Sequence, residues 1–321
     1  VADLELTPNL GYIVPALVLF QAALYKLGGG QPWLFHLMNV VLHALVVALT
    51  FLLGRALCRR VLPAAVAAGL LAVHPLVAEP VAWATGQKEL LSAALGLGGT
   101  YALVSWLRHS GALKLVTAAV LGVLAMLAKP TLLLLGPCWT LFYLALPPTF
   151  RGPSRRAATY TIGLTILAGL VLGLMNWYAR RELAFDDPQI AGGSPLLALG
   201  HQVHHLVWPT GLHPLYATDR SAGWSDPHTW LGLVLLLLLG VVAWRGRRAG
   251  PVLLGLGLAA ATYLPVSSVI PFNRYLADSY LYLPLAGLCL AVAGGLDRLL
   301  EGHATPLVTK LVVITSGVVL L

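Results

Sequence analysis

The sequence predicts an all-α fold, a polytopic bundle of transmembrane helices, and three observations lead to this prediction. Of the 321 residues, 58% are hydrophobic and 10% are charged, whereas soluble globular domains carry about 25% charged residues. Mean hydropathy is +0.83. The apolar residues are gathered in runs of about the length that crosses a bilayer as a helix. A soluble enzyme and a disordered chain are excluded, and so is a disulfide-stapled secreted domain, because the three cysteines lie at or within apolar runs.

The expected spans follow one another along the chain and number about ten. They are residues 34–54, 61–73, 90–107, 113–128, 131–147, 158–178, 228–244, 250–265, 281–296 and 306–321. Because the second run is short and the last is still apolar at its end, this number is expected to hold to within one or two. Residues 10–27 contain Pro15 and end at Lys26 and a glycine triplet, which favours an interfacial or re-entrant helix over a full span.

Basic residues occur in alternate loops and predict the orientation, because Lys and Arg concentrate in cytoplasmic loops. The basic loops contain Arg55, Arg59 and Arg60, then Arg108 and Lys114, then Arg151, Arg155 and Arg156, then Arg245, Arg247 and Arg248, and then Arg298. Asp297 and Glu301 lie on the same side, whereas the other acidic residues and most histidines lie on the opposite side. The net charge of +8 therefore reports topology, and no nucleic-acid partner is predicted.

The opposite, outer side holds four segments rich in Pro, Trp, His, Tyr and acidic residues: 1–33, 74–89, 179–227 and 266–280. Ionisable groups at membrane depth are costly and indicate function by default. We therefore expect a single transmembrane domain over residues 1–321, with a site that faces outward near the membrane boundary.

His36, Asn39 and His43 are spaced i, i+3, i+7, which places them on one face of the first full span. Hydrogen bonding to neighbouring helices is the favoured interpretation, and lining a polar cavity is the alternative.

The outer segment from His74 to Ser92 is the most informative stretch. Two prolines interrupt it, and an imidazole, an ammonium and two carboxylates are crowded into it. Other notable stretches occur in a fixed order around it. They are Tyr12 to Pro15, Pro32, Phe35 to Ala44, Lys129-Pro130, Trp208 to Leu212 with Tyr216, and Ala277 to Pro284.

In this order the stretches resemble the transmembrane and tetratricopeptide-repeat-containing (TMTC) family and its bacterial relatives, membrane glycosyltransferases of the GT-C class. The resemblance implies a GT-C-like helical fold. It also implies transfer of a hexose, mannose or a similar sugar, from a polyprenyl-phosphate donor to a Ser or Thr hydroxyl of a protein. No cofactor is predicted besides this lipid-linked donor. The bilayer, the lipid-linked sugar and the acceptor protein are the expected partners.

The chain departs from the family at several points. Gln87 and Ser279 stand where relatives usually carry arginine, so two cations that would hold a phosphate are missing. The resemblance also implies an acidic pair after a first helix, but Asp3 and Glu5 have no helix before them. We therefore expect a fragment that lacks the first helix and the repeats, with the catalytic acid upstream of residue 1.

Sugar transfer from a polyprenyl phosphate needs a base near the acceptor and cations or hydrogen-bond donors for the departing phosphate. The candidates for proton transfer or orientation are His74, Glu79, Glu89 and Asp278. The candidates for the donor phosphate and the cavity are Lys88, Lys129, Arg274, His36, Asn39 and Tyr280. Structural ion pairs, interfacial snorkelling and, for Tyr280, anchoring in the aromatic belt are the alternative roles.

Two further clusters are interpreted as structural. His201, His204 and His205 have a spacing that suits zinc, with His213 or Asp219 as a further ligand. Gln202 stands where a zinc-protease helix carries its glutamate base, which excludes that chemistry. A polar helix at the interface is favoured over a metal site, and no metal is predicted. Asp186-Asp187 precedes a proline, which is typical of a turn or a helix start.

The alternatives to an enzyme are a non-catalytic transporter or lipid-handling scaffold, and a degenerate, inactive relative. Ionisable residues lie at the outer ends of the spans, not at the midplane as in many transporters, which favours the enzyme. The Ala, Leu, Gly and Arg usage and the absence of an Asn-x-Ser/Thr acceptor favour a bacterial inner membrane over the endoplasmic reticulum, with the site on the periplasmic or lumenal face.

Overall fold

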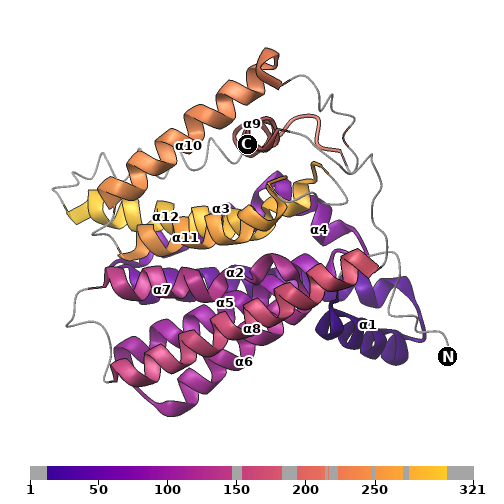
Figure 1. Ribbon diagram of the computed structural model, residues 1–321, viewed down its shortest axis with the longest axis horizontal. Coiled ribbons are helices and arrows are strands. Elements are labelled where there is room, and N and C mark those ends of the chain that lie inside the picture. Colours follow the sequence, from indigo (N-terminus) through magenta and orange to yellow (C-terminus); the bar gives the residue numbers. More distant parts are fainter. Residues whose placement is uncertain are drawn as a thin grey trace.

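The computed structural model (Figure 1) describes residues 13–146, 154–182, 194–213, 216, 223–246, 250–269 and 275–301. These residues form helices and connecting turns and contain no strand, which confirms the predicted all-α class. The α-helices are α1 (Pro15–Gly28), α2 (Pro32–Leu57), α3 (Val61–Val73), α4 (Ala78–Ala82), α5 (Gln87–His109), α6 (Ala112–Ala128), α7 (Leu135–Ala145), α8 (Arg155–Glu182), α9 (Pro195–Val207), α10 (Pro227–Gly246), α11 (Gly250–Tyr263) and α12 (Tyr282–Glu301). Short 3₁₀ turns are η1 (Pro75–Val77), η2 (Pro130–Leu132), η4 (Gly223–Ser225), η5 (Leu264–Val266) and η6 (Asp278–Leu281).

Within the described residues, four helical segments are long and apolar enough to cross a membrane: α2, α5, Arg155–Ala179 of α8, and η6 with α12. Helix α3 and the following Pro75–Ala82 segment, bent by 55°, make a fifth if they count as one span. The runs predicted at 113–128, 131–147, 228–244 and 250–265 also fall on apolar helices, but these are shorter. The predicted run 306–321 lies outside the described residues. The chain is a multi-pass membrane protein.

Helix α1 is the element predicted from residues 10–27. Its 14 residues span about 21 Å at 1.5 Å per residue, which is less than the hydrocarbon thickness of about 30 Å. It ends at Gly29, whose left-handed φ of 59° closes the last turn.

A buried glutamine, Gln87, connects α1 to its neighbours. Gln21 donates to the side chain of Gln87 (3.1 Å), and Gln87 donates to the carbonyl of Phe35 (3.4 Å). Gln87 therefore joins α1, α2 and α5.

Helices α5 and α12 form the centre of the bundle. In their apolar windows 72% and 78% of residues are buried, against 33% in α2 and 28% in α8. Small residues let the central helices approach closely. A Cβ on Gly99 would lie 3.2 Å from the carbonyl oxygen of Ala118 in α6, and one on Gly287 would lie 2.7 Å from the carbonyl oxygen of Gly255 in α11. Figure 1 shows α10 along the edge farthest from α1.

The end of α12 and the start of α3 meet at one end of the bundle. Asp297 accepts hydrogen bonds from the backbone N–H groups of Arg59 (2.9 Å) and Arg60 (3.2 Å), and Glu301 pairs with the Arg59 guanidinium (3.0 Å). These acidic and basic residues are the ones that the sequence places together on the inner side.

Candidate functional site

The opposite end of the bundle holds the helix breaks η1, α4, η2 and η6, and we call it the site end. Prolines create the breaks at η1 and η2. The residue before a proline is driven out of the α region, and accordingly His74 before Pro75 and Lys129 before Pro130 have extended backbones with ψ of 129° and 124°. Helices α3 and α6 therefore end at Val73 and Ala128, and the residue before each proline is an extended C-cap.

A buried ion pair lies at the centre of the site end. The Lys129 ammonium contacts the Glu89 carboxylate, and the two residues are only 7% and 2% exposed. Lys129 Nζ also lies 5.8 Å from the centre of the Tyr280 ring, within cation–π range. Among the described residues, Glu89 Oε1 has no hydrogen-bond partner. The charges of Lys88 and Glu79 are close enough to act on Lys129.

Two further carboxylates lie at the turn η6, Glu79 in contact with it and Asp278 as its first residue. Glu79 accepts hydrogen bonds from the backbone N–H (2.8 Å) and the hydroxyl (3.2 Å) of Ser279. Asp278 accepts a hydrogen bond from the Tyr216 hydroxyl (2.7 Å) and lies 3.3 Å from Nδ1 of His205. Burial, followed by the hydrogen bond to Asp278, raises the pKa of Tyr216, so its hydroxyl stays protonated and donates.

Three consecutive residues of η6 thus contact three different parts of the chain. Asp278 contacts His205 of α9, Ser279 contacts Glu79 of α4, and Tyr280 lies against Lys129 at the start of η2. All three η6 residues are buried. This turn assembles Glu79, Asp278 and the Glu89–Lys129 pair, which the sequence singled out separately, into one site.

The other predicted residues occupy varied positions. Both ring nitrogens of His74 bind backbone, because Nδ1 accepts from the Leu76 N–H (3.3 Å) and Nε2 therefore donates to the Leu206 carbonyl (3.1 Å). Lys88 is half-buried and has no ion pair within the part of the chain that the structure describes. Arg274 lies outside the described residues, as do Asp186, Asp187 and Asp219.

The three residues predicted to share one face of α2, His36, Asn39 and His43, have different surroundings. Asn39 is fully buried and donates to the carbonyls of Val81 (3.2 Å) and Trp83 (2.7 Å), so it holds the α4 segment. His43 contacts the Tyr282 hydroxyl at 2.8 Å. His36 is exposed.

The sequence did not predict the contact of His205 with Asp278, and indicated His205 only as a possible zinc ligand. The i, i+4 spacing from His201 shows a shared helix face, but the contact with Asp278 joins residues far apart in the chain and follows only from the way α9 packs against η6. The three histidines of α9 therefore have different partners. His205 contacts Asp278, whereas His201 and His204 contact residues at the start of α10.

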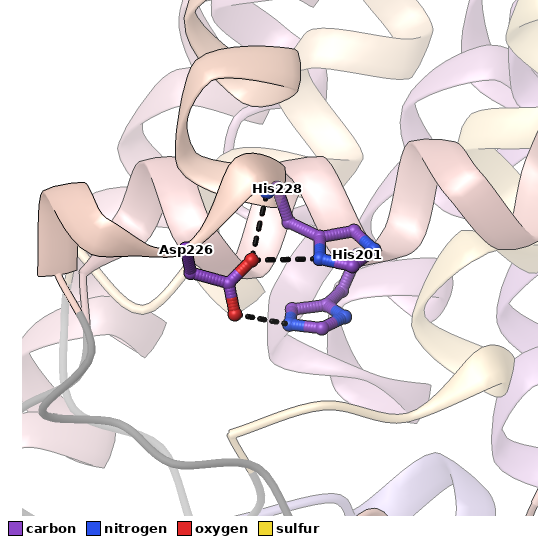
Figure 2. A group of neighbouring side chains, drawn as sticks. All are labelled: His201, Asp226 and His228. Carbon is purple, nitrogen blue, oxygen red and sulfur yellow. Dashed lines mark hydrogen bonds and ion pairs between the residues drawn. The ribbon is translucent and has the colours of Figure 1, made fainter.

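Figure 2 shows a second cluster at the start of α10, made of His201, Asp226 and His228. The His201 and His228 rings stack with their centres 3.8 Å apart. Burial, followed by the neighbouring His228, lowers the pKa of His201 to about 4, and hydrogen bonds from His228 lower the pKa of Asp226. Imidazoles and carboxylates are groups that bind transition metals.

Comparison with known proteins gives distant relatives. Protein O-mannosyl-transferase TMTC3 of Mus musculus is 25% identical and its Homo sapiens counterpart is 24% identical, each over 325 residues, which cover 86% of this chain and 34% of the relative. Protein O-mannosyl-transferase Tmtc2 of Drosophila melanogaster is 40% identical over 86 residues, 26% of this chain and 9% of the relative. No family model and no solved structure matches. The chain spans at most about a third of these relatives, and at a coarse level the homology supports a membrane glycosyltransferase.

Proposed function

We propose that the chain is the membrane core of a GT-C-like glycosyltransferase that moves a hexose, mannose or a similar sugar, from a polyprenyl phosphate to a hydroxyl of an acceptor protein. The observation that carries the proposal is the convergence of Asp278, Ser279 and Tyr280 on His205, Glu79 and Lys129. The names of the relatives supply the reaction class and the protein acceptor. The site end faces the periplasm or lumen in this proposal, and a bacterial inner membrane is favoured over the endoplasmic reticulum.

Lys88 is the cation that we assign to the donor phosphate. It lies in the first turn of α5, where the N–H groups and the helix dipole favour an anion. Within the described residues it has no ion-pair partner, whereas the charge of Lys129 is balanced by Glu89. A phosphate at the start of α5 therefore gains the charge of Lys88 without breaking the buried pair.

His205 is the group that we assign as the base. Both oxygens of Asp278 are engaged, with Tyr216 and with His205, and both oxygens of Glu79 are engaged with Ser279. Asp278 lies against Nδ1 of His205 and orients the ring, which leaves Nε2 to accept a proton. Histidine is the side chain that most often serves as a general base in enzymes.

The acceptor hydroxyl gives its proton to Nε2 of His205 while its oxygen bonds to the anomeric carbon of the sugar. The bond between that carbon and the phosphate oxygen breaks, and polyprenyl phosphate leaves with the electron pair. Lys88 stabilises the negative charge that develops on this leaving group.

The test is transfer by the full-length protein in lipid nanodiscs, with polyprenyl-phosphate mannose and a Ser/Thr-containing peptide, followed by mass spectrometry of the peptide and assay of released polyprenyl phosphate. We expect His205→Gln to lower kcat by about 10²- to 10⁴-fold and Lys88→Ala to raise KM for the donor. Lys114→Ala, a half-buried lysine at the start of α6 and the opposite end of the bundle, is the matched control.

Two results oppose the proposal. Equal turnover in the His205 and Lys88 variants and in the control would remove both residues from the site. Flux of a sugar or lipid across proteoliposomes without any covalent product would favour the transporter or lipid-handling alternative.

A further inference from the structure

We propose that His201, Asp226 and His228 form a binding site for a transition-metal ion of the zinc class, which joins α9 to the start of α10. The inference goes beyond the sugar transfer and does not depend on it. His201 belongs to α9, Asp226 directly precedes α10 and His228 lies in its first turn. The three ligand atoms lie within 4.8 Å of one another, and Figure 2 shows the three side chains.

The distances suit a metal. In tetrahedral zinc sites, bonds of about 2.0 to 2.1 Å place ligand atoms about 3.4 Å apart. His201 Nε2 lies 3.7 Å from Asp226 Oδ2, and His228 Nδ1 lies 2.8 Å from Asp226 Oδ1. Small shifts of these side chains bring all three atoms to bonding distance of one ion. Two imidazoles favour zinc and its neighbours over calcium or magnesium, which prefer oxygen ligands.

Helix capping explains part of the Asp226 geometry but not all of it. Asp226 precedes α10 and accepts the backbone N–H of His228 through Oδ1 (2.8 Å), as an N-cap aspartate does. Oδ2 instead faces His201 Nε2, at a distance beyond hydrogen bonding. His201 Nε2 is buried and has no hydrogen-bond partner within the described ranges. Such an unsatisfied buried atom calls for an explanation, and a shared metal ion gives one.

An outer ligand shell is also present. His204 Nδ1 lies 3.0 Å from His228 Nε2. With Nδ1 of His228 on the metal, the proton of Nε2 is donated to His204. Metal-binding histidines almost always make this second hydrogen bond, which fixes the tautomer and the ring orientation. The side chains of His201, Asp226 and His228 are 17%, 23% and 27% exposed, which leaves room for water as a fourth ligand.

Local packing explains why the ligands meet. Gly200 lies next to His201, and a Cβ there would overlap the backbone carbonyl of His228. Gly232 in α10 has the same relation to the Leu196 carbonyl. Two glycines therefore let the backbones touch at the level of the cluster. Because α9 also carries His205, an ion at this site would fix the helix that holds His205 against Asp278.

The test is binding of Co²⁺, a spectroscopic substitute for zinc, to the purified chain in detergent after treatment with a chelator. We expect one equivalent of Co²⁺ to give visible absorption that Zn²⁺ abolishes. Asp226→Asn keeps a residue that caps helices as well as aspartate does, yet should lose this absorption, as should His228→Ala. His204→Ala should weaken binding by about 10- to 100-fold.

The control is His109→Ala, which removes an exposed histidine at the end of α5 and should bind Co²⁺ as the parent does. Zn²⁺ should also raise the unfolding temperature of the parent but not that of Asp226→Asn. No absorption in the parent, or equal affinity in the parent, Asp226→Asn and His204→Ala, would overturn the metal site. If His228→Ala does not fold, Asp226→Asn and His204→Ala still decide.

Discussion

Replacing Lys129 with methionine tests the buried ion pair most directly. The change removes the charge and keeps an unbranched chain of similar length. It leaves the Glu89 carboxylate, 2% exposed, without its cation. Removing one partner of a buried pair costs about 3 to 5 kcal/mol. With about 2 to 4 °C for each kcal/mol, the unfolding temperature in detergent should fall by roughly 6 to 20 °C.

The double variant Glu89→Gln with Lys129→Met separates a buried charge from lost packing. With both charges removed, no uncompensated ion remains, and replacing a whole buried pair is often neutral. The double variant should therefore unfold within a few degrees of the parent, above Lys129→Met alone. Lys114→Met makes the same substitution at a half-buried lysine without an ion pair among the described residues, and should change stability by about 0.5 kcal/mol or less.

Thermal unfolding of the four proteins in one detergent decides the matter. An unfolding temperature of the double variant as low as that of Lys129→Met would mean that lost packing, not the unpaired Glu89 carboxylate, causes the loss. A shift for Lys129→Met no larger than that for Lys114→Met would refute the buried pair itself.

Three other changes have clear expected outcomes. Gly200→Ala should destabilise the chain by about 1 to 3 kcal/mol, because the added Cβ would overlap the His228 carbonyl. In Gly240→Ala, the control in α10, the added Cβ meets nothing within 4 Å and should not destabilise the chain. Equal unfolding temperatures of the two variants would contradict the close contact at Gly200. Asp297→Ala should cost about 1 to 3 kcal/mol by leaving the N–H groups before α3 unpaired, and an unchanged unfolding temperature would speak against this cap. His74→Ala should lower the unfolding temperature and leave kcat of the folded fraction unchanged, because both ring nitrogens bind backbone; a loss of kcat at full stability would return His74 to the catalytic groups.

Hydropathy and the prolines, which are local properties, predicted the helices. The apolar runs up to residue 296 fall on helices because a backbone in lipid must satisfy its own hydrogen bonds. The break after Val73 was also predictable, since Pro75 cannot continue a hydrogen-bonded helix. The pairing of Asp297 with the loop before α3 agrees with the side that the charge pattern gave to both.

Which polar groups meet was decided by tertiary packing alone. Glu79 contacts Ser279 across 200 residues of sequence, and Lys129 contacts Glu89 across 40. No periodicity gives such partners, because each contact depends on how closely two helices approach, which in α9 and α10 depends on Gly200 and Gly232. The sequence by itself therefore determined that this chain is a helical membrane protein with its polar residues at the ends of its helices. Only the packed bundle decided that the turn η6 contacts His205, Glu79 and Lys129. It also decided that Asp226 and His228, not His205, lie beside His201.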